Sequence, residues 1–250
     1  MTYLRNNREN LITIFILAIP VTIENVLQTL LGTVDTYFAG NINDNAIAAI
    51  GVTNLIINIF IAFFTAISIG TSTIVARNFG RKDIEKVNLA IKQSVILGGI
   101  ISLIVGVINL IFYEQILMIS GASGEVLTFA KPYYMIVVVP VVFLCLTLIL
   151  SSCLRSIKDT KTPMIATGVA NVINIILNLV LVKLGLGVVG IALATTISRA
   201  INVVILLIRL KRGKDGVRVN IKSLSIDKNI IKSIIKVGLP AGIEKLIMRL

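Results

Sequence analysis

The stretch PVTIE at residues 20–24 returns as PAGIE at residues 240–244, and both copies keep the proline, the isoleucine and the glutamate. The residues just upstream match in being apolar or small, and Leu30 matches Leu250 at the same spacing. Each copy places a proline four residues before a carboxylate near the start of an apolar helix, a costly combination in a membrane. We therefore expect the second stretch to open a second copy of a membrane repeat, and the chain to be a truncated half of a larger protein.

The composition assigns the chain to the membrane class. It is 56% hydrophobic and 14% charged, with a mean hydropathy of +0.96, which a soluble domain cannot bury. The net charge of +12 does not indicate nucleic-acid binding, because the basic residues lie between apolar runs without interleaved aromatics. The absence of histidine excludes His-based catalysis and His metal sites. Cys145 and Cys153 lie about 12 Å apart along one expected helix, too far for a disulfide, and are expected to be buried hydrophobes.

Runs of about 20 apolar residues predict an all-α integral membrane protein, a bundle of six membrane-spanning helices followed by a truncated seventh. We expect the first two spans to be long and tilted or kinked, with Pro20 supplying one kink. The expected domains are the six-helix lobe 1–210, a cytoplasmic linker 211–230 and the start of a second lobe at 231–250. The expected spans are 11–40, 46–76, 91–113, 132–154, 163–183 and 188–209, with the next beginning near 231.

The basic residues predict the orientation. With the N-terminus in the cytoplasm, nineteen lysines and arginines fall on the cytoplasmic side and two, Lys131 and Lys183, on the outer side. This positive-inside bias predicts a multi-pass protein of the cell membrane with six crossings. Because six is even, the two copies would be parallel repeats. The basic linker is expected to fix topology and to attract anionic membrane lipid, with a regulatory or partner site as the alternative.

Two carboxylates lie in the first span, where a charge is costly unless it is paired or hydrated. Glu24 and Asp35 are eleven residues apart, so they share a helix face with Gln28 and Gly32. That face is expected to meet protein or water. Glu24 could line a cavity, stabilise backbone groups freed by Pro20, or pair with Arg199.

The fifth span carries a second polar face, formed by Asn171, Asn174 and Asn178 at helical spacing. The expected depths place Asp35, Asn174, Asn178 and, on the sixth span, Thr196 in one layer near the outer surface. A carboxylate, two amides and a hydroxyl suit a transient Na⁺ or a protonatable site. The alternative is interhelical hydrogen bonding without ion binding. The second span carries a polar stripe that serves either cavity lining or packing, formed by Asn54, Asn58, Thr65, Ser68 and Ser72.

Three stretches, together with Pro20, resemble the multidrug and toxic compound extrusion (MATE) transporters. They are VDTYFAG at 34–40, LRSIKDTKTPM at 154–164 and GVVGIALATT at 187–196, and the resemblance covers essentially all of the chain. It implies a two-lobed antiporter that exports drugs or other amphipathic, often cationic compounds by inward H⁺ or Na⁺ flow. It also implies no enzyme activity, no cofactor, and as partners a small-molecule substrate, membrane lipid and the C-terminal lobe.

The resemblance further implies an ion site formed by Asp35, Asn174 and Thr196, with an acidic residue one turn after the asparagine. Here Asn178 stands at that position, which removes one negative charge and weakens the expectation of Na⁺ coupling. A lobe without its partner is expected not to transport.

Two alternatives remain beside the antiporter. A lipid-linked oligosaccharide flippase of the same superfamily would need a larger cationic cavity, for which Arg199 is the deep candidate. A non-transporting membrane scaffold would lack convergent geometry at Asp35 and Asn174. An enzyme is disfavoured, because Glu24 and Asp35 lie about 16 Å apart along one helix.

Overall fold

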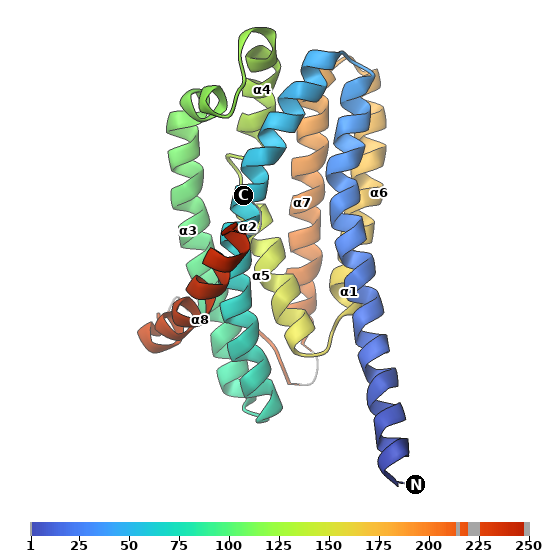
Figure 1. Ribbon diagram of the computed structural model, residues 1–250, viewed down its shortest axis with the longest axis vertical. Helices are drawn as coiled ribbons and strands as arrows, with labels where there is room; N and C mark the ends of the chain where they lie inside the picture. The colour runs from blue at the N-terminus through green and yellow to red at the C-terminus, as the bar shows by residue number, and fades with distance from the viewer. Residues whose placement is uncertain (1, 214–215, 220–225, 248–250) are drawn as a thin grey trace.

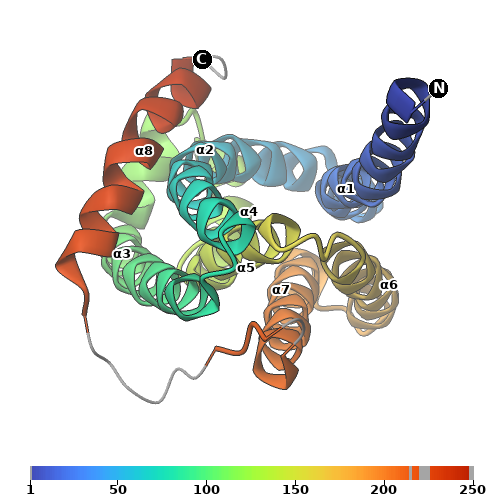
Figure 2. The ribbon, with the colours of Figure 1, turned by 90° about the horizontal axis from the view of Figure 1, so that it is seen from below.

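The computed structural model describes residues 2–213, 216–219 and 226–247. Over these residues the chain forms a bundle of long helices, seen along its length in Figure 1 and from one end in Figure 2. This confirms the all-α prediction. Leu250, and parts of the expected linker at 214–215 and 220–225, lie outside the described residues. The helices are α1 (Thr2–Gly40), α2 (Asp44–Gly80), α3 (Ile84–Ile119), α4 (Gly124–Val137), α5 (Val142–Ser156), α6 (Lys161–Lys183), α7 (Gly187–Arg212) and α8 (Lys228–Ile247).

Five of these helices, α1, α2, α3, α6 and α7, are long and apolar enough to cross a membrane. Helices α4 and α5 pass the same test together, bent by 50° at the break between them, and count as a sixth crossing if the pair is one span. The sequence predicts one span over 132–154, and the structure divides the corresponding residues into two helices at this bend. Pro140 lies in the break, where it cannot donate a backbone hydrogen bond, and the Val141 backbone opens α5 instead.

The helix α1 runs through Pro20 without interruption, and a kink at Pro20 stays a prediction. A proline removes one hydrogen bond of the helix, and a long helix can absorb that loss as gentle curvature. A break in helical geometry occurs in α3 instead, at Phe112, whose backbone angles are −109° and 16°.

Short capped turns join the long helices. The Asn43 side chain accepts a hydrogen bond from the Ala46 backbone N–H at 2.7 Å and starts α2. Asp83 starts α3 in the same way, by accepting from the Lys86 backbone N–H at 3.1 Å. Hydrogen bonds from Lys86 also hold the pKa of Asp83 below its ordinary value. The tight turns at the two ends of α2 make it run antiparallel to both α1 and α3.

The last helix, α8, packs along α2 through small residues, and both views show the two side by side. A Cβ atom added at Gly70 would lie 2.2 Å from the Ile234 carbonyl oxygen, and one at Gly238 would lie 2.5 Å from the Ala66 carbonyl oxygen. Only glycine allows backbones to approach so closely. The helix that carries the repeated PAGIE stretch, α8, therefore lies in close contact with α2.

Candidate functional site

The Asp35 side chain of α1 is buried (1% exposed) and accepts hydrogen bonds from three other helices. Its Oδ2 atom accepts from the hydroxyls of Tyr133 on α4, at 3.0 Å, and Thr195 on α7. Its Oδ1 atom accepts from the amides of Asn174 and Asn178 on α6, at 3.4 and 3.3 Å. Four donors from three helices thus converge on one carboxylate, in the interior of the helix bundle.

The asparagine face of α6 is turned toward α1 along its length. Asn171 donates to the Leu27 backbone carbonyl at 2.6 Å, which fixes the two helices against each other. Asn178 also donates to the Asn174 Oδ1 atom at 3.1 Å, and its own Oδ1 atom is buried without a hydrogen-bond partner. The predicted convergence of Asp35, Asn174 and Asn178 is therefore present in the structure.

The structure brings Thr195, not Thr196, to Asp35. Thr196 donates to the Ile136 backbone carbonyl of α4 at 2.7 Å and does not contact the carboxylate. Adjacent residues of an α-helix point about 100° apart, so two threonines at similar depth face different neighbours. Thr195 is fully enclosed (1% exposed), and it also accepts from Asn174 at 3.2 Å. The prediction that Thr196 lies beside Asp35 is therefore wrong, and the threonine that contacts Asp35 is Thr195.

Tyr133 is a partner of Asp35 that the sequence does not predict. It is 1% exposed and lies 98 residues from Asp35 along the chain, inside an apolar run that offers no spacing to link it to α1. Arg199 lies one helical turn after Thr195 on α7, and the described residues show no ion pair between Arg199 and Asp35.

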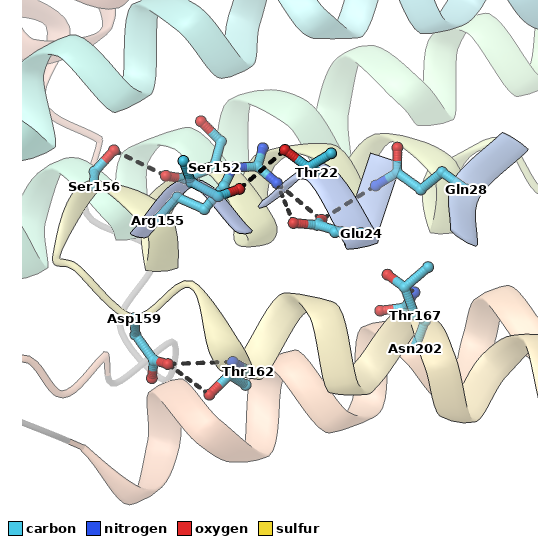
Figure 3. Close-up of polar contacts among 11 residues, drawn as sticks. Thr22, Glu24, Gln28, Ser152, Arg155, Ser156, Asp159, Thr162, Thr167 and Asn202 are labelled. Atoms are coloured by element: carbon cyan, nitrogen blue, oxygen red, sulfur yellow. Dashed lines mark hydrogen bonds and ion pairs between the residues drawn. The ribbon is translucent and has the colours of Figure 1, made fainter. Parts of the chain in front are cut away.

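A second polar cluster lies nearer the start of α1, as Figure 3 shows. Glu24 is fully buried and accepts from the Arg155 guanidinium at 2.8 and 2.7 Å, and from the Gln28 amide at 3.2 Å. The alternative that pairs Glu24 with Arg199 is wrong, because the last turn of α5 brings Arg155 to it. Gln28 therefore orients Glu24.

The remaining predicted residues lie outside both clusters. Pro20 is buried within α1, one turn before Glu24. Asn54 is partly exposed on α2, and its amide nitrogen lies 4.0 Å from a Cβ built at Gly32 of α1. Asn58, one turn further along α2, is exposed. None of the hydrogen bonds recorded at Asp35 comes from these three residues.

A pocket of about 540 Å³ lies between α2 and α5, beside the Glu24–Arg155 pair. Its wall includes Arg155, which is 28% exposed, and the hydroxyls of Ser152 and Ser156. The polar stripe of α2 that the sequence indicates, at Thr65, Ser68 and Ser72, supplies the other wall. This part of the stripe lines a cavity.

The α5–α6 turn is tied to the end of α7 by a separate ion pair. The Arg209 guanidinium lies 2.8 Å from the Asp159 carboxylate, which also accepts from the Thr162 hydroxyl at 2.9 Å (Figure 3 shows the Asp159–Thr162 contact). Asp159 is 6% exposed. Its hydrogen bonds explain why an acidic residue belongs in the LRSIKDTKTPM stretch, where it fixes the turn.

The described residues contain no cluster of three or more His, Cys, Asp or Glu side chains. A cation at Asp35 would therefore be held by one carboxylate together with amide and hydroxyl oxygens. Of these atoms, Asn178 Oδ1 is the buried acceptor without a partner. A proton would need no such ligand set, because it binds the carboxylate directly.

Comparison with known proteins agrees with this architecture. The family model MatE matches residues 20–180. The multidrug export protein MepA of Staphylococcus aureus (strain NCTC 8325 / PS 47) is 31% identical over 233 residues, covering 92% of this chain and 52% of MepA. A crystal structure of MATE in the bent conformation superimposes with a TM-score of 0.86 at 27% identity, covering 94% of this chain and 53% of that one.

An outward-facing structure of a multidrug resistance MATE transporter of the MOP superfamily gives a TM-score of 0.85 at 26% identity, again over 94% of this chain and 52% of the other. The chain thus spans about half the length of the relatives it matches. These relatives are membrane transporters and not enzymes. The matched residues include the second half of α1, with Asp35, and most of α6, with its asparagines, and the chain belongs to the MatE family of multidrug export transporters.

Proposed function

We propose that this chain is the N-terminal lobe of an ion-coupled antiporter that exports amphipathic, often cationic compounds, and that Asp35 is its coupling residue. The observation that carries the proposal is the convergence of Tyr133, Asn174, Asn178 and Thr195 on the buried Asp35 carboxylate. We place the N-terminus of the lobe in the cytoplasm, the orientation that the distribution of basic residues predicts.

The coupling follows from the hydrogen-bond capacity of the carboxyl group. An ionised carboxylate only accepts hydrogen bonds, whereas a protonated one carries a donor and accepts fewer. Four donors suit the ionised form, so neutralising Asp35 forces at least one donor to find another partner. Because these donors belong to α4, α6 and α7, the packing of α1 against them changes with the charge of Asp35. Pro20 supplies a weak point at which α1 can bend.

We propose H⁺ as the coupling ion, with Na⁺ as the alternative. Among the described residues, no second carboxylate is hydrogen-bonded to Asp35. Asn178 stands where the family resemblance implies an acidic residue. Both of its oxygen atoms already accept hydrogen bonds, which leaves few lone pairs for a metal cation. The unpartnered Asn178 Oδ1 atom supports proton binding, because a protonated Asp35 can donate to it after rotation of the amide.

The scaffold alternative predicts that Asp35 and Asn174 do not converge, whereas their side chains lie 3.4 Å apart. The flippase alternative requires a large cationic cavity. The deep cation that the sequence offers for such a cavity, Arg199, lies on α7, the helix that supplies Thr195 to Asp35.

Gradient-driven efflux tests the proposal, in proteoliposomes that contain this lobe together with the second lobe. Asp35→Asn is expected to reduce the response of efflux to a proton gradient by roughly 5–150-fold, the factor that corresponds to a coupling energy of 1–3 kcal/mol. Glu114→Gln serves as the control, because Glu114 pairs with Lys131 at the surface, at the far end of α3. Intact gradient-driven efflux in Asp35→Asn would refute the role of Asp35.

A further inference from the structure

A groove of about 910 Å³ lies between α3 and α7, away from the Asp35 site. Ile91 and Val95 of α3 form one wall, Leu207 of α7 the other, and Leu150 of α5 the floor. Helix α5 packs against both α3 and α7 and holds them apart, as the end view in Figure 2 shows. The groove is therefore a gap in the outer ring of helices, with an apolar lining.

The groove opens toward the lipid and not toward the bundle interior. On its α7 side Val204 and Ile208 are 51% and 45% exposed, whereas Ile91 and Leu150 are fully buried. Exposed apolar side chains of a membrane helix face hydrocarbon chains. An apolar groove that is continuous with that surface offers room for a hydrocarbon chain.

One end of the groove is closed by the segment that follows α7. The Val219 backbone N–H donates to the Leu210 carbonyl at 3.3 Å, and the Arg218 N–H donates to Asn88 of α3 at 2.9 Å. The segment thus bridges the end of α7 and the first turns of α3. This closed end lies where the charge bias predicts the cytoplasmic surface.

Two cations lie at this closed end. Lys211 and Arg218 both line the groove and are both exposed, and the Arg218 side chain donates to the Lys211 carbonyl at 3.1 Å. Neither appears in an ion pair recorded for the described residues. Arg209 differs, because Asp159 already neutralises it. The groove therefore combines an apolar body with a mouth that carries two cations.

We propose that this groove binds an anionic phospholipid, with one acyl chain between α3 and α7 and the phosphate at Lys211 and Arg218. Basic pockets between membrane helices on the cytoplasmic side are suited to anionic headgroups, and each cation near the surface favours them. The mostly apolar lining favours a ligand with a hydrocarbon chain over a purely polar one. The site goes beyond the proposed export activity and depends only on the proposed orientation.

Tryptophan fluorescence can test the proposal on this chain, because the sequence contains no tryptophan. Ile208→Trp places a single reporter on the exposed wall of the groove, and brominated phospholipids quench it on contact. Brominated phosphatidylglycerol is expected to bind in preference to brominated phosphatidylcholine, by about fivefold for each of the two cations. A reporter at Ile176 of α6, 53% exposed and remote from the groove, is expected to show no such preference.

The double variant Lys211→Gln/Arg218→Gln is expected to remove the preference at Ile208→Trp. Lys158→Gln/Lys161→Gln is the matched control, because it removes two exposed lysines from the α5–α6 turn at the same end of the bundle. Circular dichroism of each variant confirms its fold. Equal quenching by the two lipids, or an equal loss in both double variants, would overturn the proposal. Because Asp35 is not part of the groove, Asp35→Asn is expected to leave the lipid preference unchanged.

Discussion

The Arg155 guanidinium lies 2.7 Å from a Glu24 carboxylate oxygen and joins the end of α5 to α1, across 131 residues of sequence. The two partners are buried unequally: Glu24 is 0% exposed and Arg155 is 28% exposed. This inequality determines what each substitution costs.

Removing Arg155 is expected to cost more stability than removing Glu24. Arg155→Met leaves a buried carboxylate without its cation, which approaches the roughly 3–5 kcal/mol of a broken buried pair. Glu24→Gln leaves an arginine that can still reach solvent, so its cost is expected to be lower. Unfolding of both variants by titration with SDS measures the difference. A larger loss in Glu24→Gln would contradict the assigned burial.

Substitutions of the two adjacent threonines of α7 are expected to differ in their effect on the pH dependence of stability. Thr195→Val removes a hydrogen bond to a charged group, worth about 1.5–3 kcal/mol, and is expected to shift the pH dependence of thermal unfolding. Thr196→Val removes a bond to the Ile136 carbonyl and is expected to lower stability without that shift. The melting temperature against pH gives both quantities. The same pH dependence in Thr195→Val as in the unmodified chain would speak against its contact with Asp35.

Asn178→Asp is expected to increase the affinity for Na⁺. The change places a second carboxylate 3.3 Å from Asp35, where a bound cation offsets the repulsion between two like charges. The measurement is Na⁺-dependent thermal stabilisation of the purified chain, which is expected to be weak in the unmodified protein. Asn171→Asp is the control, since Asn171 bonds to the backbone of α1 and not to Asp35. Equal Na⁺ responses in the two variants would rule out a specific site at Asp35.

The close packing of α8 against α2 is expected to be lost when Gly238 is replaced by a larger residue. Gly238→Ala puts a methyl group 2.5 Å from the Ala66 carbonyl and must displace α8. Gly99→Ala on α3 is the control, because nothing lies within 4 Å of the added atom and its effect on stability should stay within about 1 kcal/mol. Double electron–electron resonance between spin labels on α2 and α8 reports the separation. An unchanged separation in Gly238→Ala would show that close packing does not hold α8.

Much of the fold follows from the sequence, because apolar length and basic loops are strong local signals. The polar core was predictable where spacing along one helix carries the information, as for Asp35 on α1 and Asn174 and Asn178 on α6. The choice between Thr195 and Thr196 was not, since depth alone does not tell which face of α7 meets α1. Tyr133 and Arg155 reach their partners through tertiary packing over long separations, which periodicity cannot show.

Infrared difference spectroscopy of the purified chain tests the central claim, that Asp35 takes up the coupling ion, most directly. Acidification is expected to produce the C=O band of a protonated carboxyl group, which disappears in Asp35→Asn and persists in Glu24→Gln. If Na⁺ is the ion, its addition should shift the carboxylate bands of Asp35 instead. The same ion-induced spectrum in Asp35→Asn as in the unmodified chain would contradict the account.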